Sequence, residues 1–154
     1  MAIEWNDSLF LSHEHLDDDH RQMAALINKL YLSVNEDFGK AAVAVAAREL
    51  LRFSQAHFSH EKGLMAQSDY PEMEPHLSEH KTLLDELQGL IAIVESGDGP
   101  VRFETVEFLD DWFAAHLKDA DARFAAFLIR ENGRANSREN GPEAPGPAAA
   151  EPRD

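Results

Sequence analysis

The sequence contains no cysteine among its 154 residues, which excludes disulfide bonds, thiolate metal sites and iron–sulfur clusters. It also contains no apolar run of about 18 residues, so no membrane-spanning helix is predicted and we expect no membrane insertion. Its first ten residues lack the basic start and apolar block of a secretory signal peptide. A cytoplasmic location is the expectation that follows from these absences.

Positive charge is also scarce, because 14 lysines and arginines face 29 aspartates and glutamates, for a formal net charge of −15. This charge repels phosphate backbones and anionic lipid surfaces, so we expect neither nucleic acid nor a membrane as partner. Apolar residues make up 44 % of the chain, which is enough for one folded domain with a core. The eight histidines are the most informative feature. Without cysteine, a transition-metal site must use imidazole and carboxylate, which suit iron, zinc, copper or manganese.

Apolar residues recur three and four positions apart in four segments, and this period predicts amphipathic helices. The predicted helices cover about 16–34, 40–67, 71–95 and 101–130. Residues 1–15 form an N-terminal arm, and residues 16–131 form the domain. Residues 132–154 are rich in proline, glycine and alanine and have no large apolar side chain, which predicts a disordered tail. Four helices with short connections predict an all-α, up-down-up-down antiparallel four-helix bundle.

Each predicted helix carries at least one candidate metal ligand. His57 and Glu61 are four residues apart, as are His76 and His80, so each pair lies about 40° apart on a helical wheel and faces one side. His116 and Asp121 are five apart, about 140° on an ideal wheel, and a longer reach or a π-bulge would be needed to bring them together. The complete candidate set is His20, His57, Glu61, His76, His80, His116 and Asp121.

Five imidazoles and two carboxylates are too many for one tetrahedral zinc ion. If all seven bind two six-coordinate metals, and both carboxylates and one oxygen bridge, one coordination position stays open for a small molecule. The residue types alone leave a second interpretation open, in which these side chains are surface contacts or satisfied polar groups in the core. Burying seven polar groups without partners or a metal would be costly.

Five motifs in order resemble the hemerythrin family, and within it the bacterial single-domain hemerythrins. The resemblance covers roughly residues 3 to 127 and includes all seven candidate ligand positions. The motifs are "IEWNDSL" (3–9), "LDDDHRQMAALINKL" (16–30), "HFSHEKGLM" (57–65), "YPEMEPHLSEH" (70–80) and "WFAAHLKDAD" (112–121).

The resemblance implies two non-heme iron ions per chain, bridged by an oxo or hydroxo group. It assigns His20 and His57 to one iron and His76, His80 and His116 to the other, with Glu61 and Asp121 bridging both. The spacing from His116 to Asp121 is that of the family. Dioxygen would bind at the iron with two histidines. Trp112, Phe113, Leu117 and Phe53 are the expected wall of the dioxygen pocket, where an apolar lining keeps water out.

The sequence departs from the family pattern beside the ligands. Asp19 stands where the family often has glutamine and could alter hydrogen bonding to an iron-bound imidazole. Lys62 replaces the second glutamate of its motif. The remaining histidines, His13, His15 and His60, match no ligand position and are interpreted as solvated.

The resemblance implies reversible dioxygen binding for transport, storage, delivery or sensing, and not an enzyme. An oxygen-consuming or signalling protein is the expected protein partner. The alternative is a di-iron redox enzyme acting on peroxide or nitric oxide, but no dedicated acid or base residue stands out beside the seven ligands. A metal-free interaction bundle with an acidic face is a third hypothesis, which the ligand set disfavours.

Overall fold

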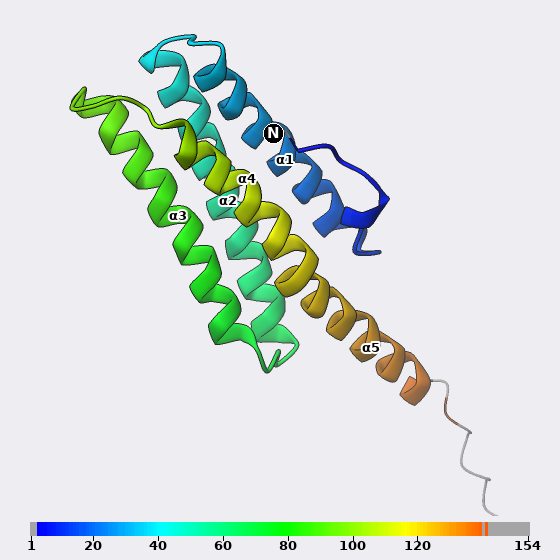
Figure 1. Ribbon diagram of the computed structural model, residues 1–154. Coiled ribbons are helices and arrows are strands. Elements are labelled where there is room, and N and C mark those ends of the chain that lie inside the picture. The colour runs from blue at the N-terminus through cyan, green and yellow to red at the C-terminus, as the bar shows by residue number, and fades with distance from the viewer. Residues whose placement is uncertain (1–2, 140, 142–154) are drawn as a thin grey trace, which may run out of the picture.

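The computed structural model describes residues 3–139 and residue 141, and its helices lie side by side in an antiparallel bundle (Figure 1). No strand occurs in this described part of the chain. The predicted all-α, up-down-up-down four-helix bundle is confirmed. The elements are η1 (Asp7–Leu9), α1 (Glu14–Asn35), α2 (Lys40–Gln67), α3 (Met73–Ser96), α4 (Phe103–His116), η2 (Leu117–Asp121) and α5 (Ala122–Glu139).

Local sequence explains where the helices begin and end. His13 caps α1, because its Nδ1 accepts a hydrogen bond from the backbone N–H of Leu16 at 3.3 Å. It is therefore a half-buried capping residue and not a purely solvated histidine. Gly97 ends α3 in the left-handed region, with a φ of 72° that glycine adopts without steric cost. Because His13 is the cap, the first helix starts at Glu14, two residues before the predicted start at Leu16.

The fourth predicted helix is a continuous rod made of α4, η2 and α5, and it extends past the rest of the bundle (Figure 1). It reaches Glu139, beyond the predicted end near Arg130, so residues 132–139 are helical where a disordered tail is predicted. These residues bury no apolar side chain, but the segment continues a packed helix and gains an ion pair between Glu131 and Arg134 at 2.9 Å. The rest of the predicted tail, apart from residue 141, lies outside the described residues.

Side-chain hydrogen bonds attach the N-terminal arm to α1. The amide of Asn28 accepts from the backbone N–H of Ile3 at 2.7 Å and donates to the Ile3 carbonyl at 2.8 Å. The buried carboxylate of Asp17 accepts from the backbone N–H groups of Leu11 and His13 at 2.7 and 3.1 Å. Leu9 is buried, and η1 packs against η2. The arm therefore covers the bundle beside the irregular turn of the fourth helix.

The core consists of two apolar clusters with a polar layer between them. The larger cluster includes Ile27, Leu50 and Leu87, all fully buried. The smaller one contains Met65, Tyr70 and Phe124 near the α2–α3 loop. The polar layer holds the seven candidate ligands, which interrupt the apolar pattern of each helix at the same depth. None of the helices in the described part is both long and apolar enough to cross a membrane.

Candidate metal centre

All seven candidate ligands are buried in the middle of the bundle, and they come from α1, α2, α3, α4 and η2. None is more than 4 % exposed. Burying polar groups in a core is unfavourable unless each finds a partner. The set is His20 from α1, His57 and Glu61 from α2, His76 and His80 from α3, His116 from α4 and Asp121 from η2.

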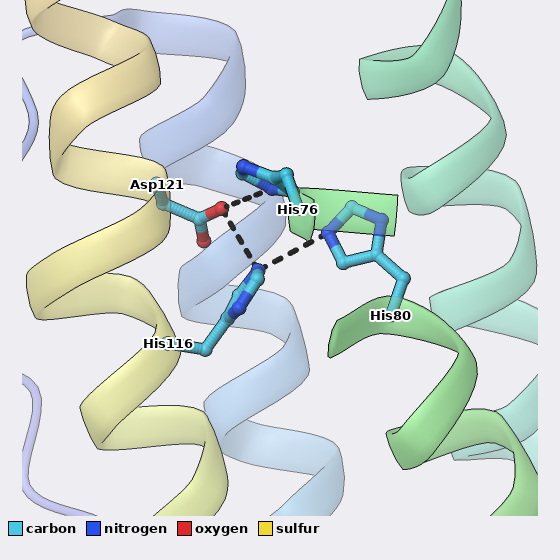
Figure 2. A group of neighbouring side chains, drawn as sticks. All are labelled: His76, His80, His116 and Asp121. Carbon is cyan, nitrogen blue, oxygen red and sulfur yellow. Dashed lines mark hydrogen bonds and ion pairs between the residues drawn. The ribbon is translucent and has the colours of Figure 1, made fainter. Parts of the chain in front are cut away.

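The larger group of ligands contains His76, His80, His116 and Asp121, which converge as Figure 2 shows. One oxygen of Asp121, Oδ1, lies 3.1 Å from Nε2 of both His76 and His116. The Nε2 atoms of His80 and His116 are also 3.1 Å apart. Three imidazole nitrogens and a carboxylate oxygen thus point at one small volume.

The smaller group contains His20, His57 and Glu61. The Nε2 atoms of the two histidines are 3.1 Å apart, and Oε2 of Glu61 lies 3.6 Å from Nε2 of His57. The four-residue step from His57 to Glu61 therefore places both side chains on the inner face of α2, as the helical wheel predicts.

The two carboxylates connect the two groups. Asp121 places Oδ2 at 3.1 Å from His20, in the smaller group, while its Oδ1 serves the larger group. Glu61 lies in the smaller group, and its Oε2 is also 3.1 Å from Nε2 of His80. Each carboxylate thus touches imidazoles of both groups, which is the placement that a bridging ligand requires.

A π-helical turn explains how His116 and Asp121 meet across five residues. The segment η2 runs from Leu117 to Asp121 between the α-helical segments α4 and α5. A π-turn pairs residues five apart, so the aspartate lies above the histidine on the same face. The sequence predicts poor geometry for this pair on an ideal α-helix and leaves open a longer reach of the aspartate or a π-bulge; the structure has the π-bulge.

The electrostatics of the group are dominated by burial and by mutual pairing of opposite charges. Burial and nearby Asp121 favour a higher pKa for Glu61, but the close imidazoles of His76 and His80 outweigh them and lower its pKa to about 2. Burial favours a lower pKa for His76, but contacts with Asp121 and Glu61 raise its pKa to about 9. Burial is also the main cause that lowers the pKa values of His57 and His80. In the metal-free cluster, protonated His76 is therefore attracted to the ionised carboxylates of Glu61 and Asp121.

Two of the five imidazoles are oriented by carboxylates outside the cluster. Nδ1 of His57 lies 2.9 Å from Oδ2 of Asp19, and Nδ1 of His116 lies 2.5 Å from Oε2 of Glu79. Such partners fix the tautomer of a metal-binding histidine, so that Nε2 presents its lone pair to the metal. Asp19 thus acts on His57, although its place in the sequence is beside His20.

The residues present fit two metal ions. Several inward-facing atoms are buried without a hydrogen-bond partner among the described residues, including both carboxylate oxygens of Glu61 and Nε2 of His76. Paired Nε2 atoms at 3.1 Å match adjacent ligands, because bonds of about 2.1 Å at a right angle separate two donors by about 3 Å. The orphaned atoms and the converging donors are accounted for together if cations lie among them.

Aromatic rings surround this layer, and the predicted wall residues are placed unequally. Trp112 stacks on His116, with ring centroids 4.5 Å apart, and Phe113 meets His20 edge-on at 6.3 Å. Leu117 is fully buried beside them. Phe53 instead lines a surface hollow between α1 and α2, and it makes no described contact with a ligand.

Sequence reasoning missed four residues around the centre. Phe58 stacks on His80 at 3.8 Å, and Tyr70 and Phe124 meet His76 edge-on at 6.4 and 6.0 Å. Phe58 follows a candidate ligand directly, which was the available signal. Glu79, the partner of His116, is half exposed and belongs to another helix. No pattern within one helix could have identified it.

Fold and site define a four-helix-bundle protein with a buried histidine–carboxylate centre whose two groups of ligands could each hold a cation. The family of the hemerythrin HHE cation binding domain matches residues 11–128, and the chain belongs to this family. Bacteriohemerythrin from Ralstonia nicotianae is 26 % identical over 97 % of this chain and 98 % of its own length. Myohemerythrin from Sipunculus nudus is 27 % identical over 80 % of this chain and 92 % of its own. The crystal structure of a wild-type hemerythrin has the same fold, with a TM-score of 0.76, 22 % identity and coverage of 83 % and 98 %.

Proposed function

We propose that the chain holds two non-heme iron ions in the buried centre. His20 and His57 would bind one iron, and His76, His80 and His116 the other. Glu61 and Asp121 would bridge them. This assignment is supported by the two carboxylates, each of which contacts histidines of both groups.

We infer that the centre binds dioxygen reversibly, as the resemblance to hemerythrins implies. The observation that carries this inference is the unequal division of ligands, with three imidazoles in one group and two in the other. The group with two imidazoles has the open position for a small ligand. When bound, the ferrous pair supplies the two electrons that dioxygen takes up and returns on release.

The surrounding side chains suit binding better than turnover. Phe113 lies against His20 in the group with two histidines. Leu117, the first residue of the π-turn, is fully buried. These apolar groups keep water from the centre, which favours release of unchanged dioxygen over its displacement by water and protons. The acidic groups nearest the ligands, Asp19 and Glu79, are both occupied in orienting imidazoles. We therefore propose a binding protein and not an enzyme.

The biological role that we propose is transport, storage, delivery or sensing of dioxygen in the cytoplasm. The lack of cysteine agrees with a reducing compartment. An oxygen-consuming or signalling protein would receive the oxygen or respond to the bound state.

Anaerobic reconstitution with ferrous iron tests this proposal. We expect two irons per chain and a visible absorption band that appears with oxygen and disappears on purging through several cycles. His57→Ala should abolish the band while circular dichroism remains helical, whereas Gln55→Ala, an exposed change on the same helix, should leave it intact. Fewer than about one iron per chain, or a normal band in His57→Ala, would contradict the assignment. Irreversible bleaching would favour redox chemistry instead.

A further inference from the structure

We propose that His15, Asp19 and His60 form a second, separate binding site for a divalent transition-metal ion on the surface of the bundle. None of the three belongs to the buried centre. They lie at the outer side of α1 and α2, where the two helices face each other near the N-terminal arm.

The geometry of this trio is that of a metal site without its ion. His15 and Asp19 are four residues apart on α1, and Nε2 of His15 lies 3.6 Å from Oδ2 of Asp19. His60 reaches across from α2, and its ring centroid is 4.4 Å from that of His15 at 75°. One donor atom from each residue lies within 4.8 Å of the other two. Small rotations of two exposed imidazoles would bring all three to bonding distance.

The simplest alternative is a chance contact between two exposed histidines. The carboxylate argues against it, because Asp19 is only 17 % exposed and is held in place by Nδ1 of buried His57 at 2.9 Å. The oxygen that His57 holds, Oδ2, is the same atom that lies 3.6 Å from Nε2 of His15, so this carboxylate already faces the two exposed histidines. One of the three ligands is therefore fixed in advance, and binding need order only the two histidines.

The donor set selects the class of ion. Two imidazoles and one carboxylate suit zinc, cobalt, nickel, copper or ferrous iron, and disfavour calcium and magnesium, which prefer oxygen ligands. Three protein ligands leave the remaining positions to water, so the ion would be exchangeable. Glu14 is exposed beside His15 at a surface hollow, and its negative charge raises the local concentration of cations.

The surface site and the buried centre would share one contact, the Asp19 carboxylate. A cation on Asp19 would draw negative charge away from the hydrogen bond to His57. This connection rests on the proposed iron assignment, whereas the surface site itself does not.

The test counts zinc ions bound by the full chain after iron loading and equilibrium dialysis at micromolar free Zn²⁺. The double variant His15→Gln/His60→Gln should bind one zinc fewer per chain than the unmodified protein, with its iron content unchanged. Asp18→Asn, which removes an exposed carboxylate from the same turn, is the matched control and should retain that zinc. Because the result is a difference, it holds even if the buried centre takes zinc in place of iron.

Equal zinc counts for the double variant and the unmodified protein would overturn the proposal, as would an equal loss in Asp18→Asn. A loss of two or more zinc ions, or of iron, would also overturn it, since the histidines would then support the buried centre. Both substitutions are at exposed helix positions, so the variant should fold, and circular dichroism verifies this. Failure of iron loading in the unmodified chain would count against the proposed function alone.

Discussion

Metal binding to the buried centre should release protons, because protons hold the metal-free cluster together. His76 has a pKa of about 9, so at pH 7 it is almost fully protonated in the metal-free chain. Glu61 has a pKa of about 2 and is already ionised, and the lowered pKa values of His57 and His80 leave them neutral. The main proton that a metal must displace is thus that of His76. His116 makes a further contribution: burial favours a lower pKa for it, but Asp121 and Glu79 outweigh burial and raise its pKa.

The size of this effect follows from the distance between pH and pKa. At pH 7 the solution is two units below the pKa of His76, so displacing this proton lowers the apparent affinity about 100-fold, or about 2.7 kcal/mol. Each unit of pH between about 6.5 and 9 should therefore raise the affinity about tenfold for this one proton, and the dependence should level off above 9.

The stability of the metal-free fold changes with pH in the opposite direction to the metal affinity. A histidine whose pKa is raised on folding stabilises the fold below its unfolded pKa of about 6.5, and the contribution is lost as pH rises through about 9. The metal-free chain should accordingly lose stability between these values, over the same range in which metal affinity increases.

The assay is anaerobic addition of ferrous iron to the metal-free chain in weak buffer with a pH indicator. We expect at least about one proton released per chain at pH 7 and about half as much from His76 at pH 9. An affinity that does not change between pH 7 and 9, together with no proton release, would refute the reasoning. It would mean that His76 is neutral in the metal-free cluster.

Two further predictions concern single side chains. Glu79→Gln should weaken iron binding about 10- to 100-fold, because it removes the carboxylate that orients His116. Glu86→Gln, an exposed change on the same helix, should leave iron binding unchanged. Competition with a chelator measures the affinity of both variants. Phe124→Ala should lower the free energy of unfolding by about 3 to 5 kcal/mol, because it empties a fully buried position against Tyr70, and urea denaturation of the metal-free chain should show this loss. A Glu79 variant with normal affinity would remove the orienting role, and a loss below about 1 kcal/mol for Phe124→Ala would show that the smaller cluster collapses around the gap.

The bundle could be predicted from the sequence because each helix has a complete apolar face. The period of the apolar residues located all four helices, and the gaps between their predicted ranges located the three loops. The C-terminal extension could not be located in this way. Residues 132–139 have no apolar stripe, and their helix depends on continuing the packed segment before them.

The ligands could be predicted in part, and the limit was geometric. Spacing of four residues identified the pairs on α2 and α3, whereas Asp121 came from the family resemblance alone. Contacts between helices, such as Glu79 with His116, have no signature in one sequence. Phe53 is predicted as a wall residue of the dioxygen pocket, but its side chain lines the surface hollow between α1 and α2, a difference that the position of a residue along one helix does not reveal.

The π-turn η2 has a consequence for the phase of the whole fourth helix. One π-turn acts as a single inserted residue, which rotates everything after it by about 100° relative to an unbroken α-helix. Phe124 is eight residues after His116 and would lie about 80° away without the insertion, but with it the two differ by only about 20°. Both are in fact buried on the inner side of the rod. The extra residue thus lets the segments before and after the π-turn face the same side of the bundle. The irregularity is confined to the turn that carries Asp121.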